Sequence, residues 1–137
     1  MKCYETLAQA AIDAKKFSYS PYSKFMVGAA LLTKSGKIYT GCNIENAAYS
    51  PTNCAERTAL FKAVSEGERE FAAIAVAGNA EGVEPDYCYP CGVCRQVLME
   101  FVGDGFEVVV VRTASDYKVY SFAEIFPFGF GPGVLKG

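Results

Sequence analysis

The chain has 137 residues, 51% of them hydrophobic, and a net charge of -2. This length suits one domain with a buried core, and we expect a single domain over residues 1–137. No apolar run is long enough to cross a bilayer, and the basic residues are scattered rather than gathered into a stripe. We therefore expect no membrane or nucleic-acid partner, and a cytoplasmic protein, because the charged N-terminus does not resemble a secretion signal.

The absence of histidine restricts the chemistry. Ser-His-Asp and Cys-His nucleophile systems cannot form within one chain that lacks this residue. Any metal must be bound by thiolates or carboxylates, and any general acid or base must be a carboxylate, lysine, tyrosine or cysteine. The six cysteines of a cytosolic protein are expected to be metal ligands or small buried hydrophobic residues rather than disulfides. We expect Cys3 and Cys42 to be of the buried kind.

The first half of the chain reads as one helix, a hairpin and a second helix. Helical spacing of apolar residues predicts a helix over about 4–16. Two β-type runs, 27–33 and 37–42, flank the Lys34-Ser35-Gly36 turn and predict a hairpin. The second helix begins near Asn53-Cys54 and ends at Gly67, a glycine suited to a helix C-terminus.

The second half alternates buried strands with helices. The continuous apolar run 71–78 predicts a central strand covered on both faces. A helix follows Pro90-Cys91-Gly92, and the apolar run 106–111 is expected to pair antiparallel with 117–121. A short helix and a tail rich in Gly, Pro and Phe end the chain. This order predicts an α/β fold, with a mixed five-stranded sheet and helices on both faces.

Three cysteines at the starts of two helices predict a metal site. Right-handed crossovers place both helices on one face of the sheet, so Cys54 is expected to lie near Cys91 and Cys94. Helix N-termini favour thiolates because their N–H groups are unpaired. Three thiolates with one open position are typical of catalytic zinc. Glu56 can reach a water at such a site, and Arg57 is expected to donate to the sulfur atoms.

Other readings of these residues have to be weighed. Asn53 and Glu56 have the spacing of a helix capping box. Cys91 and Cys94 have the spacing of a redox pair, without an obvious thioredoxin pattern around them. Cys88, Cys91 and Cys94 begin an iron–sulfur pattern, which would make the chain an electron carrier, but the next residues continue as helix. All four cysteines could also hold a structural zinc, which predicts bound metal without turnover.

The motifs "CAER" and "PCGVCRQ" resemble those of the zinc nucleoside deaminases. With "PYSKFMVGAALLT", "GCNIENAAYS" and "CAERTALFKAVSEG", they make the chain similar to the small homotetrameric cytidine deaminases. The resemblance implies their three-layer α/β/α fold. It also implies zinc-dependent hydrolytic deamination of cytidine and 2′-deoxycytidine to uridine and 2′-deoxyuridine, with release of ammonia, in pyrimidine salvage.

The resemblance also implies roles for single residues. Zinc would be bound by Cys54, Cys91 and Cys94, while Cys88 would be a bystander. Glu56 would carry protons from the attacking water to N3 and then to the amino group of cytosine. The substrate would be held by the ring of Phe25, by Asn43 and Glu45 at the ribose hydroxyls, by the Ala55 N–H at the base carbonyl, and by Tyr49 and Phe130 from a neighbouring subunit.

One position departs from the family pattern. A small Ser or Thr usually precedes the Pro-Cys pair, and here Tyr89 stands there. Its ring could reshape the pocket or cover the metal, so a different aminopyrimidine, such as a blasticidin-S-like nucleoside antibiotic, is an alternative substrate. Because "NIEN" (43–46) is as found in cytidine deaminases, cytidine remains the first expectation.

Overall fold

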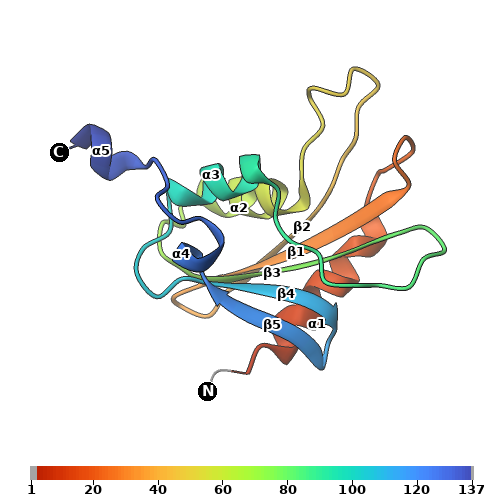
Figure 1. The fold of residues 1–137 in the computed structure, drawn as a ribbon, viewed down its shortest axis with the longest axis horizontal. Coiled ribbons are helices and arrows are strands. Elements are labelled where there is room, and N and C mark those ends of the chain that lie inside the picture. The colour runs from red at the N-terminus through yellow and green to blue at the C-terminus, as the bar shows by residue number, and fades with distance from the viewer. Residues whose placement is uncertain (1–2, 137) are drawn as a thin grey trace.

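A five-stranded sheet in the order β2-β1-β3-β4-β5 forms the centre of the computed structural model, which describes residues 3–136 (Figure 1). β3 and β4 are parallel, and the other neighbouring strands are antiparallel. The sheet is therefore mixed, as predicted. The strand bounds are β1 Phe25–Thr33, β2 Ile38–Cys42, β3 Phe71–Ala80, β4 Glu107–Thr113 and β5 Asp116–Ser121.

β3 is the central strand, and its sequence explains that place. Small and β-branched apolar residues occupy positions 72–78, so this part of the strand can be buried on both faces. Ala73, Ala75 and Ala77 belong to the core on one face, and Ile74 belongs to the core on the other. The alternation follows the two-residue period of a strand.

Helix α1 (Glu5–Ala14) covers one face and is followed by a short 3-10 turn, Lys15–Phe17. The helix predicted over 4–16 is therefore confirmed, although its last residues tighten into that turn. Gly28 on β1 allows the close approach, because a Cβ there would lie 2.1 Å from the Ala11 carbonyl oxygen.

Helices α2 (Ala55–Ser65) and α3 (Gly92–Met99) lie side by side on the other face, as predicted (Figure 1). A Cβ at Gly41 on β2 would lie 2.5 Å from the Ala59 nitrogen, so this glycine seats α2 close to the sheet. Two short helices end the chain, α4 (Phe122–Ile125) and α5 (Pro132–Lys136). The second of them forms in the segment expected to be an irregular tail. Within residues 3–136, the helices lack the length and apolar character needed to cross a membrane.

The prediction that Cys3 is buried is wrong. Cys3 is exposed because it precedes α1 instead of lying on its buried face. Cys42 is half-buried, and its thiol donates to the carbonyl oxygen of Phe17 at 3.3 Å.

Candidate active site

Three sulfur atoms from two helices come together at one end of the sheet. The Sγ atoms of Cys54 and Cys91 are 3.6 Å apart, and those of Cys91 and Cys94 are 3.4 Å apart. All three lie within 4.8 Å of one another. Cys54 is the N-cap residue of α2 and Cys91 that of α3, so unpaired N–H groups of both helices surround the sulfur atoms.

The charges of the three thiols depend on one another. Hydrogen bonding from Cys94, supported by Arg57 and Cys91, lowers the pKa of Cys54 to about 5. Hydrogen bonding to Cys54 raises the pKa of Cys94, because a second negative charge beside the first is unfavourable. A cation among the sulfur atoms removes this conflict.

The spacing of the sulfur atoms fits zinc. With Zn–S distances of about 2.3 Å, tetrahedral coordination separates two sulfur atoms by about 3.8 Å, close to the observed separations. Cys88 is not a member of this group. A Cβ built on Gly78 would lie 2.9 Å from the Cys88 sulfur and 3.1 Å from the Phe25 ring, so Cys88 packs against β3 beside that ring. This arrangement argues against a cluster or structural zinc held by all four cysteines.

Glu56 is the second residue of α2 and is only 4% exposed. Burial raises its pKa to about 7, and the negative charge of Cys54 acts in the same direction. The capping box considered for Asn53 and Glu56 is not formed, because Cys54 is the N-cap residue and α2 has no side-chain cap. Asn53 instead donates to the Thr58 hydroxyl at 3.2 Å. Glu56 therefore has the burial and pKa of a proton carrier rather than those of a capping residue.

Arg57 contacts the sulfur group as expected. Its Nη2 donates to the Cys54 Sγ at 3.2 Å. Its buried Nε has no hydrogen-bond partner among the described residues. The guanidinium thus places a positive charge directly against a thiolate.

The segment 43–45 lies beside the start of α2. Two backbone hydrogen bonds, 2.9 and 3.0 Å long, join Ile44 to Asn53, the residue before Cys54. Asn43 is buried, and its Nδ2 donates to the Phe25 carbonyl at 2.8 Å. Its Oδ1 accepts from the Val27 N–H at 2.9 Å and from the Ser18 hydroxyl. One N–H of the amide remains for a ligand.

Glu45 is held in place by the loop before β1. Its Oε1 accepts from the N–H groups of Tyr22 and Ser23 at 2.9 and 3.2 Å, and its Oε2 accepts from the Ser23 hydroxyl. The hydrogen bond from that hydroxyl is the main reason that the pKa of Glu45 is lowered. The carboxylate is thus ionised and oriented, with capacity on Oε2 to accept a further hydrogen bond.

Comparisons with known proteins agree with this geometry. A sequence profile described as the cytidine and deoxycytidylate deaminase zinc-binding region matches residues 1–112. A cytidine deaminase of Sporosarcina psychrophila is 49% identical over 126 residues, which cover 92% of this chain and 90% of that protein. The chain belongs to the cytidine and deoxycytidylate deaminase family.

Solved structures of the family share the fold. The crystal structure of cytidine deaminase from Burkholderia pseudomallei has a TM-score of 0.82 at 47% sequence identity, covering 95% of this chain and 100% of that one. That of cytidine deaminase from Mycobacterium tuberculosis has a TM-score of 0.80 at 33% identity, covering 96% and 99%. The fold and family predicted from the motifs are confirmed, and zinc is the cofactor, for which the three-cysteine group is positioned.

Two residues expected to act on a neighbouring subunit are exposed in this deaminase fold. Tyr49 is 71% exposed and belongs to the loop 46–52, whereas Phe130 is 55% exposed and belongs to the C-terminal segment. In Figure 1 this loop projects at the top of the view and this segment at the left. The chain alone does not bring the two aromatic rings together.

Several supporting residues of the site were missed at the sequence level. Ser18 and Ser23 orient Asn43 and Glu45, and both lie in the stretch "SYSPYSKF". Its density of hydroxyl groups between a helix and a strand was the available signal. The choice of partner for each hydroxyl depends on the path of the loop, which spacing does not reveal.

Proposed function

We propose that the chain is a cytidine deaminase that hydrolyses cytidine and 2′-deoxycytidine to uridine and 2′-deoxyuridine plus ammonia, in pyrimidine salvage. The observation that carries the proposal is the buried carboxyl of Glu56, whose pKa is raised to about 7, beside three converging cysteine sulfur atoms. A proton carrier of this pKa can both accept and release a proton near neutral pH. We assign the whole chain to one deaminase domain, in the cytoplasm.

Cys54, Cys91 and Cys94 would hold the zinc, which supplies a Lewis acid that activates water near neutral pH. Glu56 accepts a proton from the attacking water and delivers it to N3 of the cytosine ring, which makes C4 more electrophilic. It then takes the proton of the hydroxyl group added at C4 and delivers it to the amino group; the C4–N bond breaks, ammonia leaves, and the C4 carbonyl of uridine forms. Because the carboxylate is regenerated between the two transfers, one residue serves both steps.

Arg57 is proposed to tune the metal. Three thiolates outweigh the two positive charges of zinc, which weakens its action as a Lewis acid. The hydrogen bond from Arg57 to Cys54 withdraws part of that negative charge.

The nucleoside would lie between β1 and the start of α2. Phe25 is 40% exposed and offers its ring to the pyrimidine, while the Ala55 N–H, which has no partner within the helix, binds the base carbonyl. The free N–H of Asn43 donates to a ribose hydroxyl and Glu45 accepts from one.

A homotetramer with shared sites is part of the proposal. Tyr49 and Phe130 would each complete the site of a neighbouring subunit. Their exposure in the single chain supports this, as does that of Phe128, because exposed aromatic clusters are typical of interfaces.

The orientation of Tyr89 supports cytidine over another aminopyrimidine. Its hydroxyl is 2.9 Å from that of Tyr120, and the two ring centroids are 5.8 Å apart. The ring is thus directed at β5 instead of at the sulfur group.

A substrate panel tests the proposal. Zinc-loaded protein is mixed separately with cytidine, 2′-deoxycytidine, deoxycytidylate and cytosine, and ammonia release is measured. We expect both nucleosides to react far faster than the nucleotide or the free base. Preferred release from deoxycytidylate, or none from any compound, contradicts the proposed substrate.

A further inference from the structure

The segment 86–90, which leads into Cys91, contacts both β5 and β3. Its side chains alternate, as in an extended strand. Tyr87 and Tyr89 contact one face of β5, where Asp116, Lys118 and Tyr120 follow one another at two-residue intervals.

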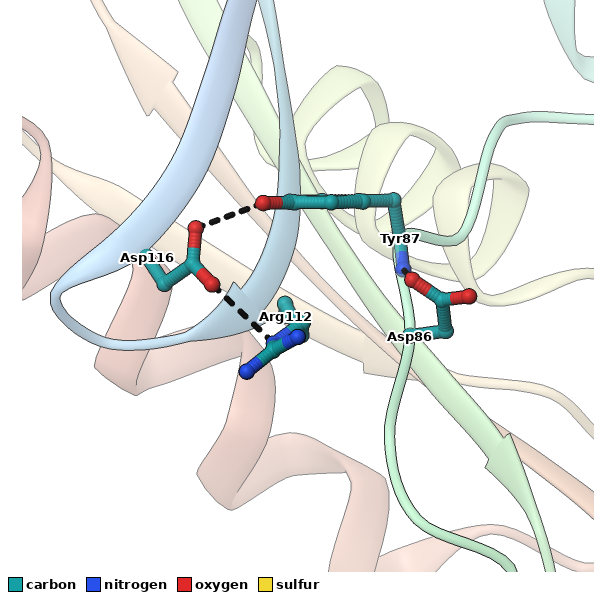
Figure 2. Close-up of polar contacts among 4 residues, drawn as sticks. All are labelled: Asp86, Tyr87, Arg112 and Asp116. Atoms are coloured by element: carbon teal, nitrogen blue, oxygen red, sulfur yellow. Dashed lines mark hydrogen bonds and ion pairs between the residues drawn. The ribbon is translucent and has the colours of Figure 1, made fainter.

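Tyr87 makes the more elaborate of the two contacts (Figure 2). Its hydroxyl donates to Asp116 Oδ1 at 2.6 Å, and Arg112 Nε holds Asp116 Oδ2 at 3.0 Å. Its backbone N–H donates to Asp86 Oδ1 at 2.7 Å. Lys118 places its Nζ 4.4 Å from the centroid of the same ring. The tyrosine is thus held from the hydroxyl, the ring and the backbone.

Cys88, between the two tyrosines, faces the opposite way. Its sulfur occupies the space beside Gly78 that a Cβ there would need, next to the ring of Phe25. Burial raises the pKa of this thiol to about 11, and the negative charges of Glu56 and Cys54 act in the same direction. A backbone bridge between Gly78 and Asp86 closes the segment onto β3.

We infer that Tyr87, through its bond to Asp116, is a positioning residue that holds Cys88 in place as a wall of the nucleoside pocket. The inference rests on the proposed function only in naming the ligand of that pocket. When Tyr87 and Tyr89 are fixed on β5, the residue between them cannot turn away from Gly78 and Phe25. Cys88 therefore has a role in shaping the site, although it is not a metal ligand.

The test compares two Tyr→Phe variants of the zinc-loaded protein. Tyr87→Phe removes the bond to Asp116. Tyr117→Phe, on the opposite face of β5, also removes one tyrosine hydrogen bond, in which the Tyr117 hydroxyl accepts from the Tyr4 N–H at 2.9 Å. Iodoacetamide labelling of Cys88 is followed by tandem mass spectrometry, with the exposed Cys3 as an internal reference. KM and kcat for cytidine and the zinc content are measured on the same samples.

We expect Tyr87→Phe to speed labelling of Cys88 and to raise the KM for cytidine, each by roughly three- to tenfold, the range of one net hydrogen bond. Zinc content and labelling of Cys3 stay unchanged. Asp116→Ala reproduces the effect, while Asp116→Asn, which keeps an acceptor oxygen, has a smaller one. Tyr117→Phe leaves both readouts at their native values.

Equal labelling of Cys88 in the two Tyr→Phe variants, or an unchanged KM in Tyr87→Phe, overturns the inference. Uridine, the proposed product, is expected to slow labelling of Cys88 but not of Cys3 in the native chain. If uridine gives no protection while Tyr87→Phe still exposes Cys88, then the Tyr87–Asp116 bond does position Cys88, but the ligand named by the proposed function is wrong. The two failures are therefore distinguishable.

Discussion

Glu56 and the three cysteines illustrate how neighbouring residues set one another's charge. The carboxyl is buried beside thiols of which one is readily ionised and another is not. Each added negative charge makes the next less favourable in a site of low polarity. A divalent cation is the natural counterpart of such a group, and the raised pKa of Glu56 leaves it able to exchange protons near neutrality.

Replacing Glu56 by Gln separates proton transfer from metal binding. The amide has nearly the same size, so Glu56→Gln is expected to retain zinc and the native fold. Turnover of cytidine should fall by about a hundredfold or more, because an amide cannot carry the protons. Zinc content by atomic absorption and initial rates provide the check. Near-native turnover with full zinc would mean that another group carries the proton.

Arg57→Ala tests the charge placed on the metal centre. Loss of the guanidinium beside Cys54 is expected to weaken zinc binding by about tenfold or more, the usual effect of removing a group that orients metal ligands. Competition with a chromogenic chelator measures this. Arg69→Ala is the matched control, because among the described residues Arg69 donates to the carbonyls of Val64, in the last turn of α2, and of Glu68, which follows that helix. Equal zinc affinity in the two variants would rule out the proposed role.

At the scale of elements, two glycines seat helices on opposite faces of the sheet. Gly41 brings α2, and with it Cys54, against β2, whereas Gly28 brings α1 against β1. Neither glycine can be replaced by a residue with a Cβ unless backbone atoms move. The position of the sulfur group thus depends on the contact at Gly41 and not on the contact at Gly28.

The variants Gly41→Ala and Gly28→Ala form a matched pair. Both are expected to lower the free energy of unfolding by about 1–3 kcal/mol, the usual effect of overpacking, as measured by urea denaturation. Only Gly41→Ala should weaken zinc binding as well, because α2 begins at the proposed ligand Cys54, whereas α1 carries no proposed ligand. Equal loss of zinc affinity in both would show that the site follows global stability instead of the seating of α2.

The elements were predictable from local spacing, and the metal group was predictable from the handedness of the crossovers that join those elements. Apolar periodicity gave the helices and strands, and Cys54 with Cys91 and Cys94 at helix starts indicated the site. The exposure of Cys3 was missed because the helical period does not assign a buried or exposed face to a residue that lies just before a helix. The bond of Tyr87 to Asp116 was equally hidden, because it depends on where a loop crosses a strand 29 residues later in the chain.

At the scale of the whole molecule, the proposed homotetramer predicts that the site of a single chain is incomplete. Asn43 is bonded to the Phe25 carbonyl, whereas Tyr49 and Phe130 are exposed. The proposed sharing of sites would account for large aromatic side chains that remain uncovered in one chain.

Mixing two variants with different defects tests the proposed shared site. Phe130→Ala is expected to reduce kcat/KM while retaining zinc, and Glu56→Gln lacks the proton carrier. Co-assembled subunits should regain part of the native rate, since some sites then draw Glu56 from one chain and Phe130 from the other. Size-exclusion chromatography with light scattering confirms the assembly. If no activity returns in verified mixed tetramers, Phe130 does not complete a neighbouring site.

The most direct test of the central claim is to follow zinc content and uridine formation together while the metal is removed and restored. The three-cysteine site with Glu56 predicts one zinc ion per chain, loss of turnover when a chelator removes it, and recovery when zinc returns. In Cys91→Ala, both zinc retention and turnover should be lost. Full turnover of cytidine by metal-free protein, or native zinc content in Cys91→Ala, would contradict it.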